Sequence, residues 1–258
     1  MANRRFAELR QPQVKELITD RSIFVQPLGA VEQHGPHLPF LTDLLIAGST
    51  ADAVAADRGD ELDLWIGEPL AYTKSNEHAH FPGSVWMGAQ TMLSVLDDVG
   101  RAVAATGARK LVFLNGHGGN TALLNVACRE VRLRHGLITF LMHPSVPPDA
   151  GGASNADELG MGIHAGLHET SVLLHLRPDL VDMSLATRNV PEWLAANEHV
   201  RFGGAVTFGW LADDFGPDGH IGDPTASTPE LGKQLFEGYA SRLGDQLAEV
   251  SRFEFNRG

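Results

Sequence analysis

The chain has 258 residues, of which 43% are hydrophobic and 20% are charged, the balance of a globular protein that can bury a full core. Its formal net charge of −12 argues against nucleic acid as a partner, because phosphate binding needs a basic face. No apolar run approaches the length of a membrane span, and the polar N-terminus lacks the apolar segment of a signal peptide. With a single cysteine, Cys128, the chain cannot form an internal disulfide. We therefore expect a cytoplasmic protein with no membrane contact, folded as one domain over residues 1–258.

Short apolar runs alternate with helical patterns along the chain. Strands are predicted at 22–28, 62–66, 111–114 and 137–142, with a further possible strand at 205–210. Helices are predicted at about 43–56, 89–105, 122–135 and 228–250. Such alternation predicts an α/β fold, a single layered domain with a mostly parallel central sheet flanked by helices. A Pro/Gly-rich loop at 144–157 is long enough for a lid or a subunit contact.

Acidic residues and a histidine gather just after the first predicted strand. Glu32 and His34 are two residues apart, so in an extended or looped backbone their side chains leave on the same side. Asp43 stands just before an apolar helical pattern, which is the usual place for a helix N-cap. Taken singly, the three are most simply a solvated acid, a hydrogen-bonded histidine and a cap.

Two later motifs carry the same chemistry. The motif NGHGGN, starting at residue 115, follows an apolar run, and its glycines can present His117 at the carboxyl end of a strand, where α/β sheets bind ligands. The motif HAGLHETS places His164, His168 and Glu169 at the head of another helical segment. Clustering of this kind indicates a metal site rather than scattered structural histidines.

The histidines of the chain are clustered rather than evenly spread. We expect one of them, His78, to be solvated. Seven of the twelve histidines fall in four short stretches: His34, His37, His78, His80, His117, His164 and His168.

Together these motifs closely resemble the creatininase (creatinine amidohydrolase) family of metal-dependent amide hydrolases. The resemblance rests on GAVEQHGPHLP at 29–39 with TD at 42–43, on NGHGGN at 115–120 and on HAGLHETS at 164–171. It extends over about residues 28–225, most of the chain. It implies a dinuclear metal-dependent amidohydrolase that cleaves a C–N amide bond with metal-activated water.

The resemblance also implies a role for each motif residue. Glu32 and His117 correspond to ligands of one metal ion, His34 to a ligand of the other, and Asp43 to the bridging carboxylate. His164 corresponds to the catalytic histidine, which would protonate the leaving nitrogen or stabilise the oxyanion. Two divalent ions, zinc and/or manganese, are the implied cofactors, since both accept mixed nitrogen and oxygen ligands.

One ligand of the family pattern is missing. Creatinine-cleaving members carry a metal-binding glutamate at the position that is Gly119 here. Our hypothesis is that Glu169 supplies the missing carboxylate, because it is acidic and lies near His164 in the same motif. The rival ligand is His168.

The expected substrate pocket contains His37, His80, Gly118 and Asn120. Glycine at 118 and at 160 replaces the aromatic residues of creatinine-specific members, which favours a more open pocket and disfavours creatinine. A small-molecule amide or a short peptide is the expected substrate. An alternative is a peptidase of the type that trims the mycofactocin precursor, which belongs to the same family. Family members usually form homo-oligomers, often hexamers, and we expect one here.

A different class of function stays open as an alternative. A non-catalytic metal- or anion-binding module would keep the strands and glycines of this pattern. Such a module would lose one or more of the residues Glu32, His34, Asp43, His117 and His164. Because all five are present, catalysis is the favoured interpretation.

Overall fold

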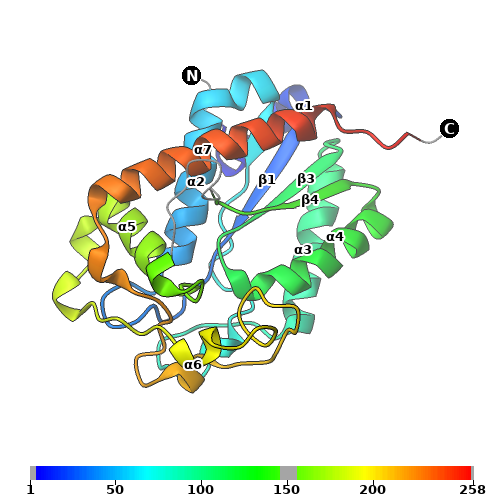
Figure 1. Ribbon diagram of the computed structural model, residues 1–258. Helices are drawn as coiled ribbons and strands as arrows, with labels where there is room; N and C mark the ends of the chain where they lie inside the picture. The colour runs from blue at the N-terminus through cyan, green and yellow to red at the C-terminus, as the bar shows by residue number, and fades with distance from the viewer. Residues whose placement is uncertain (1–3, 146–155, 257–258) are drawn as a thin grey trace.

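The central sheet of the protein has four parallel strands in the order β2-β1-β3-β4. Figure 1 shows β1, β3 and β4 side by side. The computed structural model describes residues 4–145 and 156–256. The strands are β1 (Ile23–Leu28), β2 (Leu64–Ile66), β3 (Lys110–Asn115) and β4 (Ile138–Met142). A parallel sheet with helical connections confirms the predicted α/β fold.

Helices connect and cover these strands. In the described residues they are α1 (Gln11–Leu17), α2 (Thr42–Leu62), α3 (Ala89–Ala105), α4 (Thr121–His135), α5 (Leu167–Leu176), α6 (Glu192–Ala195) and α7 (Pro229–Arg252). Helix α3 has the predicted bounds, whereas α2 is longer than predicted. None of the helices in these residues is both long and apolar enough to cross a membrane.

The strand predicted at 205–210 is wrong. In the described chain this segment makes only a single bridge, between Val206 and Val200, and belongs to no named strand. Its aromatic side chains pack locally instead, with the ring centroids of Phe202 and Phe208 5.5 Å apart. Local aromatic packing, rather than sheet pairing, explains the apolar alternation that suggested a strand.

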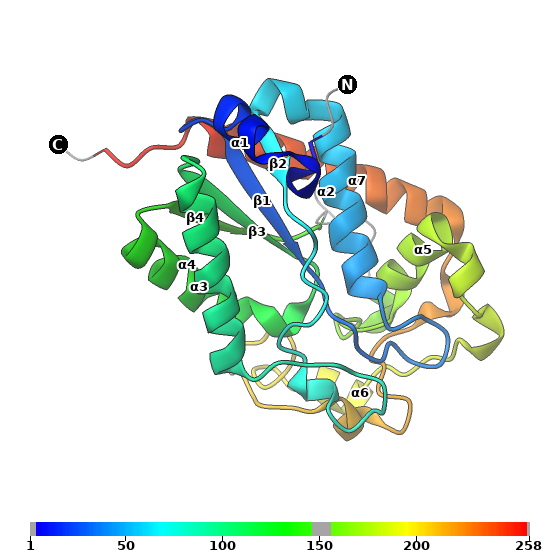
Figure 2. The same cartoon turned by 180° about the vertical axis from the view of Figure 1, so that it is seen from behind.

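Both faces of the sheet are buried, which is why its strands are nearly continuous apolar runs. Phe24 and Phe113 pack in the core under α3 and α4. Val25 and Leu114, one residue further along each strand, pack in the opposite core under α2 and α7. The two helix layers lie on opposite sides of the sheet (Figure 2).

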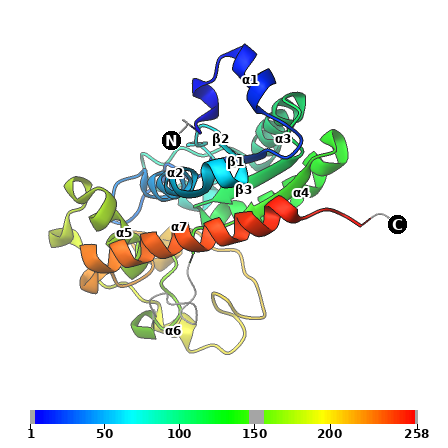
Figure 3. The same ribbon diagram turned by 90° about the horizontal axis from the view of Figure 1, so that it is seen from above.

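Helix α7 is the longest element and runs across one side of the molecule from α5 (Figure 3). Thr228 caps it, with its hydroxyl accepting the backbone N–H of Leu231 at 3.1 Å, and Pro229 occupies the first turn. Its contacts with α5 and α2 fix both helices relative to the sheet. The N-terminal ends of α2 and α5 therefore lie beside the carboxyl ends of the strands.

The loop before α5 is tied to the rest of the fold by Glu158, which is almost fully buried. Its Oε1 accepts the backbone N–H of Leu167 at 3.0 Å and that of Asp223 at 2.7 Å. His164 is held by backbone hydrogen bonds with Ile221 in both directions. These contacts place the HAGLHETS segment against the sheet edge. The predicted lid or subunit contact at 144–157 falls largely on residues 146–155, which lie outside the described residues.

Candidate metal centre

Six side chains from distant parts of the sequence meet at the carboxyl edge of the sheet. The loop after β1 carries two, the first turn of α2 one, the loop after β3 one, and the HAGLHETS segment two. They are Glu32, His34, Asp43, His117, His164 and Glu169. Charged groups are rarely buried unless they are paired or bind a metal, so this concentration marks a functional site.

The carboxylates of Glu32 and Asp43 converge on His117. Its Nδ1 lies 3.2 Å from Oε1 of Glu32 and 3.1 Å from Oδ2 of Asp43. Both oxygens are buried, and neither receives a hydrogen bond from the described residues. Buried carboxylate oxygens normally have donors, so two orphaned ones facing an imidazole fit the ligand set of a cation.

Asp43 also belongs to a second group, with His34 and Glu169. Its other oxygen, Oδ1, lies 3.1 Å from Nε2 of His34. One ligand atom from each of these three residues lies within 4.8 Å of the other two. Asp43 thus presents one oxygen to each group, the arrangement a bridging carboxylate needs. The N-cap interpretation of Asp43 is wrong, since α2 begins at Thr42, inside whose first turn Asp43 lies.

His164 adjoins these two groups and forms a third with Glu32 and His34, in which one ligand atom from each residue lies within 4.8 Å of the other two. Its Nε2 donates to the backbone carbonyl of Gln33 at 2.8 Å, which leaves Nδ1 facing Oε1 of Glu32 at 3.7 Å. Its ring lies between those of His34 and His78, 4.3 Å from each centroid. The hydrogen bond to Gln33 fixes both the orientation and the tautomer of the ring.

Burial and mutual proximity shift the ionisation of these groups. Burial alone would lower the pKa of His34, but Asp43 and two further carboxylates raise it to about 10. Burial would likewise lower the pKa of His117, but Glu32 and Asp43 raise it well above its usual value. The pKa of Glu169 is raised to about 7, mainly by burial. Perturbed groups of this kind cluster at functional sites.

His164 differs from the other two histidines. Burial, followed by the neighbouring His34 and His78, lowers its pKa well below the usual value. It is therefore neutral at pH 7, with the lone pair of Nδ1 directed at the cluster.

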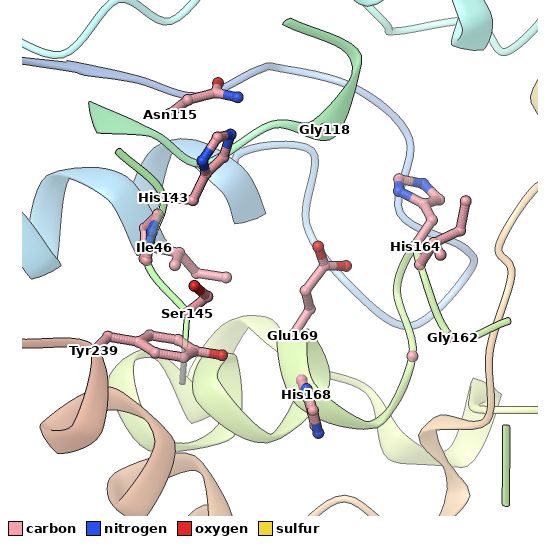
Figure 4. A pocket seen from close by; sticks show the side chains of 14 residues that line it. Ile46, Asn115, Gly118, His143, Ser145, Gly162, His164, His168, Glu169 and Tyr239 are labelled. Atoms are coloured by element: carbon pink, nitrogen blue, oxygen red, sulfur yellow. The ribbon is translucent and has the colours of Figure 1, made fainter. Parts of the chain in front are cut away.

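A cavity of about 380 Å³ adjoins these residues (Figure 4). His164 and Glu169 line it, together with Gly118 and Tyr239. The carboxylate of Glu169 points toward His164, whereas the ring of His168 points away from it (Figure 4). His168 is in none of the potential metal-binding groups of the described residues, so the geometry favours Glu169 over His168 as the extra ligand.

The other predicted pocket residues lie elsewhere. His37 is buried, with its Nε2 3.0 Å from Oγ1 of Thr170. Asn120 is buried and accepts the backbone N–H of Lys74 at 3.1 Å. His80 is exposed. Of the four predicted pocket residues, only Gly118 lines the described cavity.

Residues 75–78 contribute side chains that the sequence did not indicate. His78, which we expected to be solvated, is 1% exposed, and its Nε2 lies 3.4 Å from Oε1 of Glu32. The Ser75 hydroxyl donates a short hydrogen bond to the other oxygen of Glu32. Glu77 contacts His117. The sequence did contain a signal for this contribution, since Glu77 and His78 are adjacent and His80 follows closely.

Comparison with known proteins identifies the family of the chain. A family model described as "Creatinine amidohydrolase" (Creatininase) matches residues 7–247. A mycofactocin precursor peptide peptidase of Mycobacterium ulcerans (strain Agy99) is 35% identical over 233 residues, which cover 88% of this chain and 84% of the relative. A creatinine amidohydrolase of Pseudomonas putida is 30% identical over 185 residues, covering 66% of this chain and 70% of the relative.

A solved structure described as "Creatininase Mn" superposes with a TM-score of 0.76 at 22% identity, covering 98% of this chain and all of that one. At that identity the similarity establishes the fold alone. The family match, which covers nearly the whole chain, and the relatives at 30% identity and above go further. The chain belongs to the creatininase family, whose hydrolases act on C–N bonds.

Proposed function

We propose that this protein is a dinuclear metal-dependent hydrolase that cleaves an amide bond in a short peptide. The observation that carries the proposal is Asp43, whose two carboxylate oxygens face two separate groups of potential ligands. A carboxylate shared in this way is what a pair of metal ions a few ångströms apart requires.

Two of the three groups supply the ligand sets, and the third, Glu32, His34 and His164, contains the histidine that we assign to proton transfer. We assign Glu32, Asp43 and His117 to the first ion and His34, Asp43 and Glu169 to the second. Glu169 thereby takes the place of the carboxylate that is absent at Gly119. The nitrogen and oxygen ligands suit zinc or manganese. Divalent ions held there would lower the pKa of a bound water and polarise the substrate carbonyl.

The protein's own residues would orient that chemistry. The backbone N–H of Ala165 donates to Oε2 of Glu169 at 2.6 Å, which fixes the orientation of this carboxylate beside His34 and Asp43. The hydroxyl of Ser75 anchors Glu32 in the same way. Hydrogen bonds of this kind fix ligating carboxylates before a metal arrives.

His164 is the proposed proton carrier. It is neutral at pH 7, and Gln33 holds its Nε2–H, so Nδ1 can accept a proton. We assign it to accept a proton at Nδ1 and to donate it to the departing nitrogen. Its place in the cavity wall gives it access to the substrate.

The substrate assignment rests on the relatives. The mycofactocin precursor peptide peptidase matches more of the chain, at higher identity, than the creatinine amidohydrolase does. A cavity of about 380 Å³ also has room for more than a small cyclic amide. We therefore favour the end of a precursor peptide of the mycofactocin type as substrate, processed in the cytoplasm by a homo-oligomer. A non-catalytic binding module is the weaker alternative, because it does not need the neutral His164.

Hydrolysis by the metal-loaded protein tests this proposal. Protein reconstituted with zinc or manganese is incubated with creatinine, a formamide and short peptides that carry the C-terminal sequence of a mycofactocin precursor. We expect cleavage of a peptide, detected as a new amine by mass spectrometry, and its loss on chelation. Cleavage of creatinine alone would assign the protein to the other branch, and a metal-loaded protein inactive on the whole panel would favour the binding module.

Substitution of Glu169 tests the second ligand set. Glu169→Gln removes the negative charge with little change of shape, so the second ion should be lost and metal content should fall from about two ions per chain to about one. Elemental analysis after gel filtration measures this. His168→Gln is the matched control, one residue away, and should keep about two. The opposite result for the two variants would make His168 the ligand.

Proton release on metal binding tests the ionisation of the cluster. In the metal-free protein His34 has a pKa of about 10 and His117 one well above its usual value, so both rings carry an extra proton at pH 7. A metal can bind only the deprotonated nitrogen, so loading both ions at pH 7 should release about two protons per chain, one from each ring. Apparent affinity should therefore rise with pH from 7 toward 10.

Calorimetry in two buffers that differ in ionisation enthalpy measures this release. Equal heats in both buffers, together with an affinity independent of pH, would contradict the assignment.

A further inference from the structure

Glu77 is a largely buried carboxylate on the far side of His117 from the cluster. It lies in the turn Asn76–His78, and its Oε1 is 3.0 Å from Nε2 of His117. The backbone carbonyl of Lys74 lies 3.1 Å from the same nitrogen. Both neighbours are acceptors, so Nε2 must carry a proton and donate it to them.

The proton on Nε2 leaves Nδ1 of His117 as the nitrogen that can bind a metal ion. With the proton on Nε2, Nδ1 of the neutral ring has a free lone pair, and Nδ1 is the atom that faces Glu32 and Asp43. Glu77 itself is in none of the potential metal-binding groups of the described residues. Its position is therefore that of a carboxylate that orients a ligating histidine from behind.

Gly119 makes room for this contact. A Cβ added at Gly119 would lie 1.6 Å from Oε1 of Glu77 and 2.4 Å from Nε2 of His117. Any side chain there would have to displace the carboxylate from the imidazole. At Gly118, by contrast, an added Cβ would meet nothing within 4 Å. The need for glycine is thus specific to position 119.

We propose that Glu77 is a positioning residue for the metal centre, which holds His117 with Nδ1 toward Glu32 and Asp43, and that glycine at 119 is required to admit it. This inference rests on the proposed metal centre. It explains why position 119 has no side chain, because the carboxylate of Glu77, from the turn at 76–78, occupies that space.

If Glu77 had a purely structural role, its ion pair with Lys74 would be the contact that matters. Its Nζ lies 3.3 Å from Oε2 of Glu77, so the ion pair could simply anchor the turn. Partly exposed ion pairs contribute little, and this one uses the oxygen that does not touch His117. Lys74→Met removes the pair and leaves the backbone carbonyl and the histidine contact in place, which separates the two roles.

Metal affinity measured by chelator competition with zinc tests the proposal. Glu77→Ala and Gly119→Ala should each weaken binding at the first site by about 10- to 100-fold, the usual effect of losing such a partner. Because both changes remove the same contact, the double variant should be no weaker than the weaker single variant. Gly118→Ala and Lys74→Met are the controls and should bind zinc as the wild type does.

Glu77→Gln guards against a general folding defect, because it keeps the shape of the side chain and should give a smaller loss of affinity than Glu77→Ala. Three results would each overturn the inference. The first is wild-type affinity in both Glu77 variants, and the second is independent effects that multiply in the double variant. The third is a loss of affinity in Lys74→Met equal to that in Glu77→Ala. These outcomes leave the metal centre standing. Failure of the wild type to bind either zinc or manganese would instead refute the proposed function.

Discussion

The structure depends on keeping two carboxylates, Glu32 and Asp43, out of water at the carboxyl edge of the sheet. Each is almost completely buried, and each has an oxygen that no hydrogen bond reaches in the described residues. Buried negative charge is costly unless a cation compensates it. Protonated His34 and His117 can do so in the metal-free protein, and divalent ions would do so in the loaded one. The surrounding fold serves to hold these opposing charges together.

Backbone geometry at the ends of the strands positions the cluster. Leu28 pairs with Asn115 at the ends of β1 and β3, so the two following loops start side by side. At Gly29 an added Cβ would lie 2.4 Å from the backbone of Leu44, so only glycine lets the first turn of α2 come this close. Asp43 reaches the cluster because of that approach. Contacts through Glu158 and Ile221 then fix the segment that carries His164 and Glu169.

Much of the fold and of the metal centre could be predicted from the sequence, because local residue patterns determine it. Apolar runs and helical periodicity gave the strands and α3, and the glycine-flanked histidines pointed to the sheet edge. The burial of His78 and the role of Glu77 could not be predicted, since both depend on how the turn at 76–78 folds back on His117. Asp43 looked like a helix cap because its partners are distant in sequence. The apolar residues at 205–210 looked like a strand because local aromatic packing has the same composition.

Crystals of the protein grown with manganese would test the central claim most directly, by anomalous diffraction at the metal edge. We predict two peaks per chain, about 3.5–4 Å apart, on either side of the Asp43 carboxylate. One should contact Glu32 and His117, and the other His34 and Glu169. A single peak, or two peaks that do not share Asp43, would contradict it.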